Sequence, residues 1–196
     1  AYTSFDVTCY TEDIPSNQVE NWAKIQADRF KNSIIRGFHT ELETVYEEKN
    51  MSLTQDPRKV SETMLAALFP HHPYGTQTVL GTQDDLKNPS ITNIKNYYKT
   101  WYVPNNMAIC LSGDFNPDEM IATIDKYFGD MKPNPNLPKL TVKPETPITE
   151  PIVREVLGPD AESVTLAWRF PGSASKEYET PVSYTHLRAH ETLANL

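Results

Sequence analysis

Two glutamates, Glu41 and Glu48, are the residues whose type and spacing most directly suggest chemistry. They lie seven residues apart in a segment that reads as helix, and about 100° per residue returns position 48 to the face of position 41. Val45 lies between them, which predicts a half-buried acidic stripe. Buried carboxylates need a cation or hydrogen-bond donors to offset the loss of water. The alternatives are a bound metal, a Lys or Arg partner, or a plain solvated helix surface.

The histidines do not add a metal site to this pair. His39 is isolated, and His71 and His72 are adjacent, so none of them provides a pair at helical spacing. His186 and His190 have the i, i+4 spacing of a helical metal pair. Two histidines are too few for a site, and their segment has no clear apolar face, so no metal is predicted there.

Five helices and several strands are expected to position these residues. Apolar periodicity and start signals such as Ser90 and Pro117 predict helices over 16–30, 40–53, 57–69, 91–101 and 117–128. The Pro- and Gly-rich segment 70–82 predicts a loop. Segments rich in β-branched, aromatic or purely apolar residues predict strands at 1–10, 107–111, 152–157 and 163–170.

A proline-rich segment divides the chain. Residues 132–151 hold six of the chain's 16 prolines, a density typical of a semi-rigid extended spacer. We therefore expect a first domain over 1–131, a linker over 132–151, and the start of a second, similar domain over 152–181.

Composition narrows the classes of partner. The 196 residues carry a net charge of −8 and a pI near 5.1, which argues against a nucleic-acid or anionic-membrane surface. No apolar run approaches the ~20 residues of a membrane span. Cys9 and Cys110 allow one disulfide, but two small buried thiols are the favoured interpretation. The sequence begins with Ala1 and not with Met, so it does not indicate whether the protein is cytoplasmic or periplasmic.

Four short stretches of the sequence follow one another in a fixed order: Ala1-Tyr2-Thr3-Ser4, Glu41-x-x-x-Val45-x-x-Glu48, His72-Pro73-Tyr74-Gly75, and Tyr102-x-Pro104-x-Asn106-Met107 followed by Gly113-Asp114. In their order and spacing they resemble the insulinase/pitrilysin family of zinc peptidases, which includes mitochondrial processing peptidase. The resemblance covers about residues 1–178. The resemblance implies an α+β fold, with a mostly antiparallel sheet packed against helices.

The resemblance also implies a metal and roles for the two glutamates. Members of the family bind zinc through His-x-x-Glu-His and a glutamate on a later helix. Glu48 corresponds to that late ligand, and Glu41 to a carboxylate that orients a ligand by hydrogen bonding. The motif's own glutamate is the general base for the zinc-bound water.

A peptide-binding edge is implied at the beginning of the chain. In the family, the strand represented by Ala1, Tyr2, Thr3 and Ser4 is a sheet edge on which substrate lies as an added strand. The alternative is an ordinary strand inside a sheet.

The sequence departs from the family pattern because it contains no His-x-x-Glu-His. We expect that helix upstream of Ala1, so this stretch would lack the general base and two zinc ligands. Zinc is then a cofactor of the intact parent protein, not stably held by this stretch alone.

The predicted function is that of an inactive piece of a zinc metalloendopeptidase acting on peptides or unfolded segments. The expected partners are a peptide substrate and a second homologous domain, in the same chain or in a partner subunit. Two alternatives stay open: a non-catalytic family member serving as partner subunit or chamber wall, and an extended-peptide binding module without hydrolysis.

The end of the sequence is set apart from these predictions. Residues 182–192, VSYTHLRAHET, resemble a translated sequencing adapter. We therefore treat 182–196 as a non-native tail.

Overall fold

The computed structural model describes residues 1–172 and 175–176. Its contacts group the chain into two units that interleave along the sequence. Unit 1 comprises Ala1–Gln55 and Gln77–Pro144, and unit 2 comprises Asp56–Thr76 and the chain from Glu145 onward. The change at residue 144 falls inside the proline-rich segment, which has neither helix nor strand in the structure. The predicted domain limits themselves stay a prediction.

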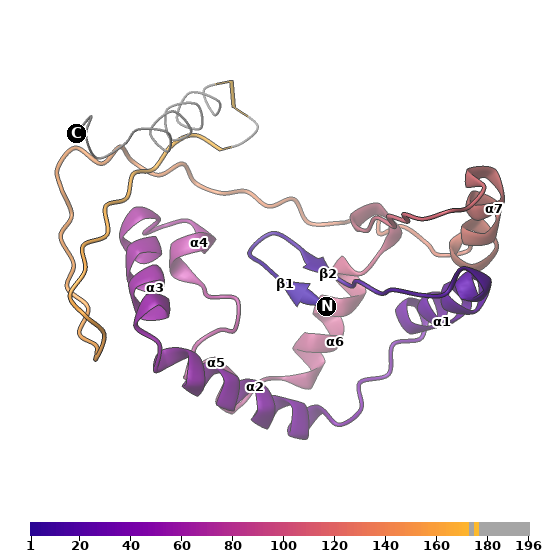
Figure 1. Ribbon diagram of the computed structural model, residues 1–196, viewed down its shortest axis with the longest axis horizontal. Helices are drawn as coiled ribbons and strands as arrows, with labels where there is room; N and C mark the ends of the chain where they lie inside the picture. The colour runs from indigo at the N-terminus through magenta and orange to yellow at the C-terminus, as the bar shows by residue number, and fades with distance from the viewer. Residues whose placement is uncertain (173–174, 177–196) are drawn as a thin grey trace. The chain divides into compact units, whose positions relative to one another are not determined.

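Unit 1 begins with a small antiparallel hairpin, labelled β1 and β2 in Figure 1. Strand β1 (Tyr2–Thr3) pairs with β2 (Thr8–Cys9), with Tyr2 opposite Cys9. The backbone N–H of Ser4 donates to the carbonyl of Val7 at 2.8 Å and closes the turn. The strand predicted over 1–10 is therefore two short strands joined by a turn.

All five predicted helices are present. In unit 1 the structure has η1 (Ser16–Gln18), α1 (Val19–Lys31), α2 (Phe38–Leu53), α5 (Gln83–Lys87), α6 (Ile91–Trp101), η2 (Pro104–Asn106) and α7 (Pro117–Phe128); unit 2 has α3 (Asp56–Leu68) and α4 (Pro73–Thr76). The short helices α4 and α5 were not expected from the sequence.

Local capping explains where several helices begin. The Ser90 hydroxyl accepts a hydrogen bond from the Asn93 N–H at 3.3 Å, and the Asn116 side chain accepts one from the Asp118 N–H at 2.9 Å. Helix α5 begins with a reciprocal capping box between Thr82 and Asp85. These contacts satisfy N–H groups that the first helical turn leaves free.

Helix α1 packs against α7, and the two lie side by side in Figure 1. Ala23 and Ala27, one turn apart on α1, are the buried apolar side chains of the described chain. The carboxylate of Glu20 on α1 accepts hydrogen bonds from Lys126 at 2.6 Å and from the Tyr127 hydroxyl at 2.9 Å. The polar contacts of Glu20 therefore join the two helices.

An aromatic cluster joins α1, α6 and the residue after β2. The rings of Tyr98 and Tyr102 stack with centroids 4.3 Å apart, and Phe30 contacts both Tyr102 and Tyr10. The Arg29 guanidinium lies 4.4 Å from the Tyr10 ring centroid, a cation–π contact. Burial, together with a hydrogen bond to the Tyr10 hydroxyl 3.3 Å away, raises the pKa of Tyr102 to about 12.

The expectation of a mostly antiparallel sheet is wrong for the described residues, which are rich in helix and contain one two-stranded sheet. Segments 107–111, 152–157 and 163–170 are not strands. A strand requires a neighbour to pair its backbone N–H and C=O groups, and no part of the described chain pairs with these segments. Apolar side chains on the last one are left in solvent, with Val164 86%, Leu166 72% and Trp168 70% exposed.

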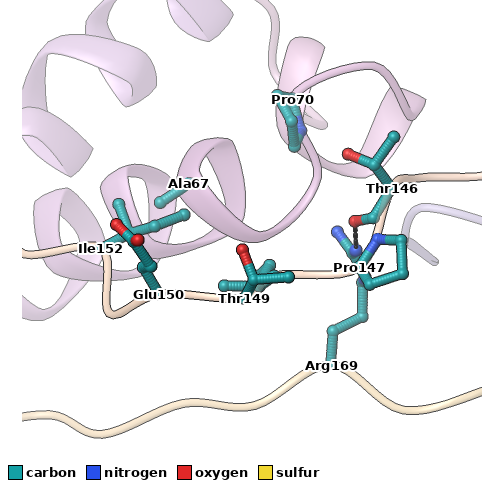
Figure 2. Close-up of a pocket in the computed structure, with 9 residues that line it drawn as sticks. Ala67, Pro70, Thr146, Pro147, Thr149, Glu150, Ile152 and Arg169 are labelled. Atoms are coloured by element: carbon teal, nitrogen blue, oxygen red, sulfur yellow. Dashed lines mark hydrogen bonds between the residues drawn. The ribbon is translucent and has the colours of Figure 1, made fainter.

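In unit 2, helices α3 and α4 pack together as a hairpin. Gly75 allows this packing, since a Cβ on it would lie 2.6 Å from the Leu65 carbonyl oxygen and closer still to that of Phe69. The segment that follows Glu145 contacts the end of α3 and the loop between the helices, in a region drawn in Figure 2.

Candidate functional site

Helix α2 carries both predicted zinc-site glutamates. It begins after Gly37, whose φ of +62° is left-handed, and the Glu41 N–H donates to the Gly37 carbonyl at 3.0 Å. The helix confirms that Glu41 and Glu48 share one face. Both carboxylates are exposed, however, and only Val45 is half-buried. The expected half-buried acidic stripe is therefore solvated, because full burial on α2 is confined to its last turns, at Lys49 and Ser52.

Neither carboxylate has a protein partner within the described residues. The side chains of Glu41 and Glu48 make no hydrogen bond or ion pair there, and no group of three His, Cys, Asp or Glu side chains in that part of the chain could hold a metal. Catalytic zinc sites use three protein ligands. The described residues therefore do not form such a site by themselves. The ligand role of Glu48 stays a prediction.

The predicted peptide-binding residues lie on an open strand edge. Strand β1 pairs with β2 along one edge, and no other strand of the described chain pairs with its second edge. Residues 1–4 are all exposed, with Tyr2 58% exposed. An extended peptide could add to this edge through backbone hydrogen bonds. The role of Ala1–Ser4 stays a prediction.

The His-His-Pro-Tyr loop, by contrast, is held by a carboxylate distant in sequence. Glu145 accepts hydrogen bonds from the N–H groups of His71 and His72, at 2.6 and 2.7 Å. Its other oxygen lies 3.0 Å from His71 Nδ1, which is therefore the donor, since a carboxylate only accepts. The Glu145 side chain is 6% exposed and that of His71 is 61% exposed.

Electrostatics at Glu145 follow from these contacts. Desolvation alone would raise the pKa of Glu145, but the His71 side chain and the two backbone N–H groups lower it further than desolvation raises it. Sequence reasoning missed this residue. Its partners lie more than 70 positions away and no local pattern links them.

His72 and Tyr74 form loop packing in the structure. The Tyr74 N–H donates to His72 Nδ1 at 3.1 Å, which leaves the proton of a neutral imidazole on Nε2. Their rings lie 4.3 Å apart, and Phe69 contacts both.

A small hollow of about 270 Å³ lies beside this loop, between the end of α3 and residues 146–152 (Figure 2). Arg169 lines it and donates to the carbonyl oxygens of Leu68 and Thr146, while its guanidinium lies 5.8 Å from the Phe69 ring centroid. None of the predicted site residues lines the hollow.

Two expectations from the sequence concern the C-terminal histidines and membrane-spanning helices. His186 and His190, with the whole adapter-like tail, lie outside the described residues. Within the described part of the chain, no helix combines the length and apolar character that crossing a bilayer requires.

Comparison with known proteins gives the family. A family model described as the peptidase M16 inactive domain matches residues 90–195. A zinc protease of Mycobacterium leprae is 29% identical over 131 residues, covering 66% of this chain and 29% of the relative. YmxG of Bacillus subtilis, also named a zinc protease, is 27% identical over 158 residues, covering 74% of this chain and 38% of the relative.

A probable mitochondrial-processing peptidase subunit beta of Schizosaccharomyces pombe is 28% identical over 137 residues, covering 68% of this chain and 30% of the relative. The chain thus spans about a third of the length of these curated relatives. Since the family model covers more than half of the sequence, the chain belongs to the M16 peptidase family, the insulinase/pitrilysin type that its motifs resemble.

Proposed function

We propose that this chain is part of a zinc-dependent endopeptidase that cleaves peptides or unfolded segments. The observation that carries the proposal is the pair Glu41 and Glu48 on α2 of an M16-family chain, exposed and without a protein partner in the described residues. Relatives named zinc proteases support the same metal.

In this proposal Glu48 supplies one carboxylate ligand, and Glu41 orients a neighbouring ligand by hydrogen bonding. Zinc, when bound, lowers the pKa of a water molecule and polarises the scissile carbonyl. The remaining ligands and the general base come from a His-x-x-Glu-His helix outside this sequence. The open edge of β1 aligns the substrate backbone, which favours extended chains over folded ones.

Zinc content tests the ligand assignment. In the full-length parent protein, Glu48→Gln should remove most of the bound zinc measured by mass spectrometry, because a neutral amide is a poor zinc ligand. Glu41→Gln should weaken zinc binding or activity by about 10- to 100-fold, the usual effect of losing a group that orients a ligand.

Glu43→Gln is the matched control. Glu43 is exposed on the same helix and undergoes the same chemical change, but lies about 140° around the axis from Glu48. Equal zinc content in the Glu48→Gln and Glu43→Gln proteins would show that the assignment is wrong.

A second candidate is a non-catalytic subunit that supports an active partner. The description of the matching family model as an inactive domain, and a relative named as a processing-peptidase subunit, favour it. The gene upstream of Ala1 separates the two: a His-x-x-Glu-His motif several dozen residues before Glu48 supports hydrolysis, and its absence from the intact gene supports the subunit.

A further inference from the structure

Unit 2 contains a carboxylate whose surroundings the proposed function does not use. Glu145 is the first residue of the second stretch of unit 2, on the proline-rich segment, and its side chain is almost completely removed from solvent. A buried ionised carboxylate is costly unless donors surround it. Here three donors do so: two backbone N–H groups and the His71 imidazole.

The donors belong to the loop between α3 and α4, so Glu145 binds that loop directly. The backbone N–H groups of residues 71 and 72 both donate to Glu145 Oε1. The contact therefore depends on the backbone conformation of the loop. His71 adds a charge-assisted hydrogen bond to the second oxygen of Glu145.

Arg169 makes a second attachment at the end of the same helix. Its guanidinium bonds the Leu68 carbonyl, at the last residue of α3, and the Thr146 carbonyl, next to Glu145. A cation at the carbonyl end of a helix is favourable. Figure 2 shows this side chain reaching from its own segment to Thr146, beside the hollow.

A third attachment lies at the other end of α3. The Asp56 carboxylate accepts bonds from Lys59 at 2.7 Å and from the Asp160 N–H at 2.9 Å. The segment after residue 145 is thus fixed at both ends of α3.

We propose that Glu145 is a latch that fastens the end of the proline-rich segment to the α3–α4 hairpin, so that the hairpin and residues 145–172 behave as one mechanical body. Asn134 is hydrogen-bonded to Asn105 and Thr100. The connection between that attachment and the latch is then residues 135–144.

Backbone hydrogen exchange on the whole 196-residue chain tests the latch. In Glu145→Ala the amides of His71 and His72 should exchange about tenfold faster or more, because each loses a charged acceptor. Glu145→Gln keeps an oxygen for both amides and should give a smaller increase. Glu150→Ala removes an exposed carboxylate of the same segment and should change neither rate. Unchanged exchange of both amides in folded Glu145→Ala would overturn the proposal.

Trypsin cleavage tests the single-body claim separately. Loss of the latch in Glu145→Ala, alone or with Arg169→Ala, should speed cleavage after Arg154, whereas cleavage after Lys139 should not change. Faster cleavage only in the double variant would show that either attachment alone holds the segment on the hairpin, and would still support a single body. Unchanged cleavage after Arg154 in the double variant would overturn the claim.

Discussion

The Glu145 carboxylate shows how donors from distant parts of the sequence keep a charge stable out of water. Its pKa is lowered from the usual 4.5, chiefly by His71, against the opposing effect of desolvation. Arg169 donates a hydrogen bond to the carbonyl of the next residue, Thr146. A carboxyl group that is hydrogen-bonded in this way stabilises the fold only while it is ionised.

The sign of the pH effect follows from that lowered pKa. The stability that Glu145 contributes is fully present above about pH 4.5 and is lost as pH falls through its folded-state pKa. Acid unfolding of the wild-type chain and of Glu145→Gln, followed by circular dichroism, should therefore converge below pH 4.5. Parallel curves across that range would contradict the prediction.

Tyr102 gives a prediction at the alkaline end. Its pKa of about 12 lies above the usual 10, so the stability linked to the neutral phenol is present below pH 10 and is lost between about pH 10 and 12. Tyr102→Phe should remove this alkaline loss and lower the free energy of unfolding by about 1 kcal/mol at neutral pH, through the lost hydrogen bond to Tyr10.

Urea unfolding at pH 7 and pH 11 measures both effects of Tyr102→Phe. Tyr97→Phe is the control, since Tyr97 is 62% exposed on α6, the helix that ends just before Tyr102. An equal response of the two variants would mean that the aromatic cluster does not stabilise unit 1.

At the level of elements, the α3–α4 hairpin depends on a close backbone approach at Gly75. Gly75→Ala places a methyl group against the carbonyl oxygens of Leu65 and Phe69, so the two helices must separate. We expect a loss of about 1–3 kcal/mol in unfolding free energy, the usual effect of overpacking.

Gly172→Ala is the matched control for this substitution, because no atom lies within 4 Å of the added methyl group. Thermal unfolding and exchange rates over α3 and α4 measure the difference. Equal stability of the two variants would exclude the close approach as the reason for glycine at position 75.

The five long helices could be predicted from the sequence because their signals are local. Ser90, Pro117 and the apolar spacing of each segment act within a few residues. The capping box of Thr82 and Asp85 is a local signal of the same kind, and it could have revealed α5. The helix position of Glu41 and Glu48 was predictable for the same reason.

Strand pairing, burial and the Glu145 contacts could not be predicted, because they depend on partners far away in the sequence. Segment 163–170 has strand-like composition, but the described chain supplies no neighbour for it. The exposure of Glu48 likewise depends on what packs against α2, which its own spacing does not specify.

For the whole molecule, the unpaired apolar side chains of segment 163–170 carry a consequence for solubility. Exposed apolar, strand-like segments favour association between chains. We expect the isolated chain to self-associate, and Val164→Lys with Leu166→Lys to increase the monomer fraction without lowering the melting temperature. Light scattering with Thr165→Lys as control checks this; equal association of all three proteins would contradict it.

The interleaving of the two units also sets an order of events during synthesis on the ribosome. The α3–α4 hairpin emerges long before its attachments, since Glu145 follows His71 by 74 residues and Arg169 follows Leu68 by 101. At 5–20 residues per second the hairpin waits roughly 4–20 s for them. During that interval Phe69 lacks its contact with Arg169, and the nascent hairpin is open to chaperones or to a neighbouring chain.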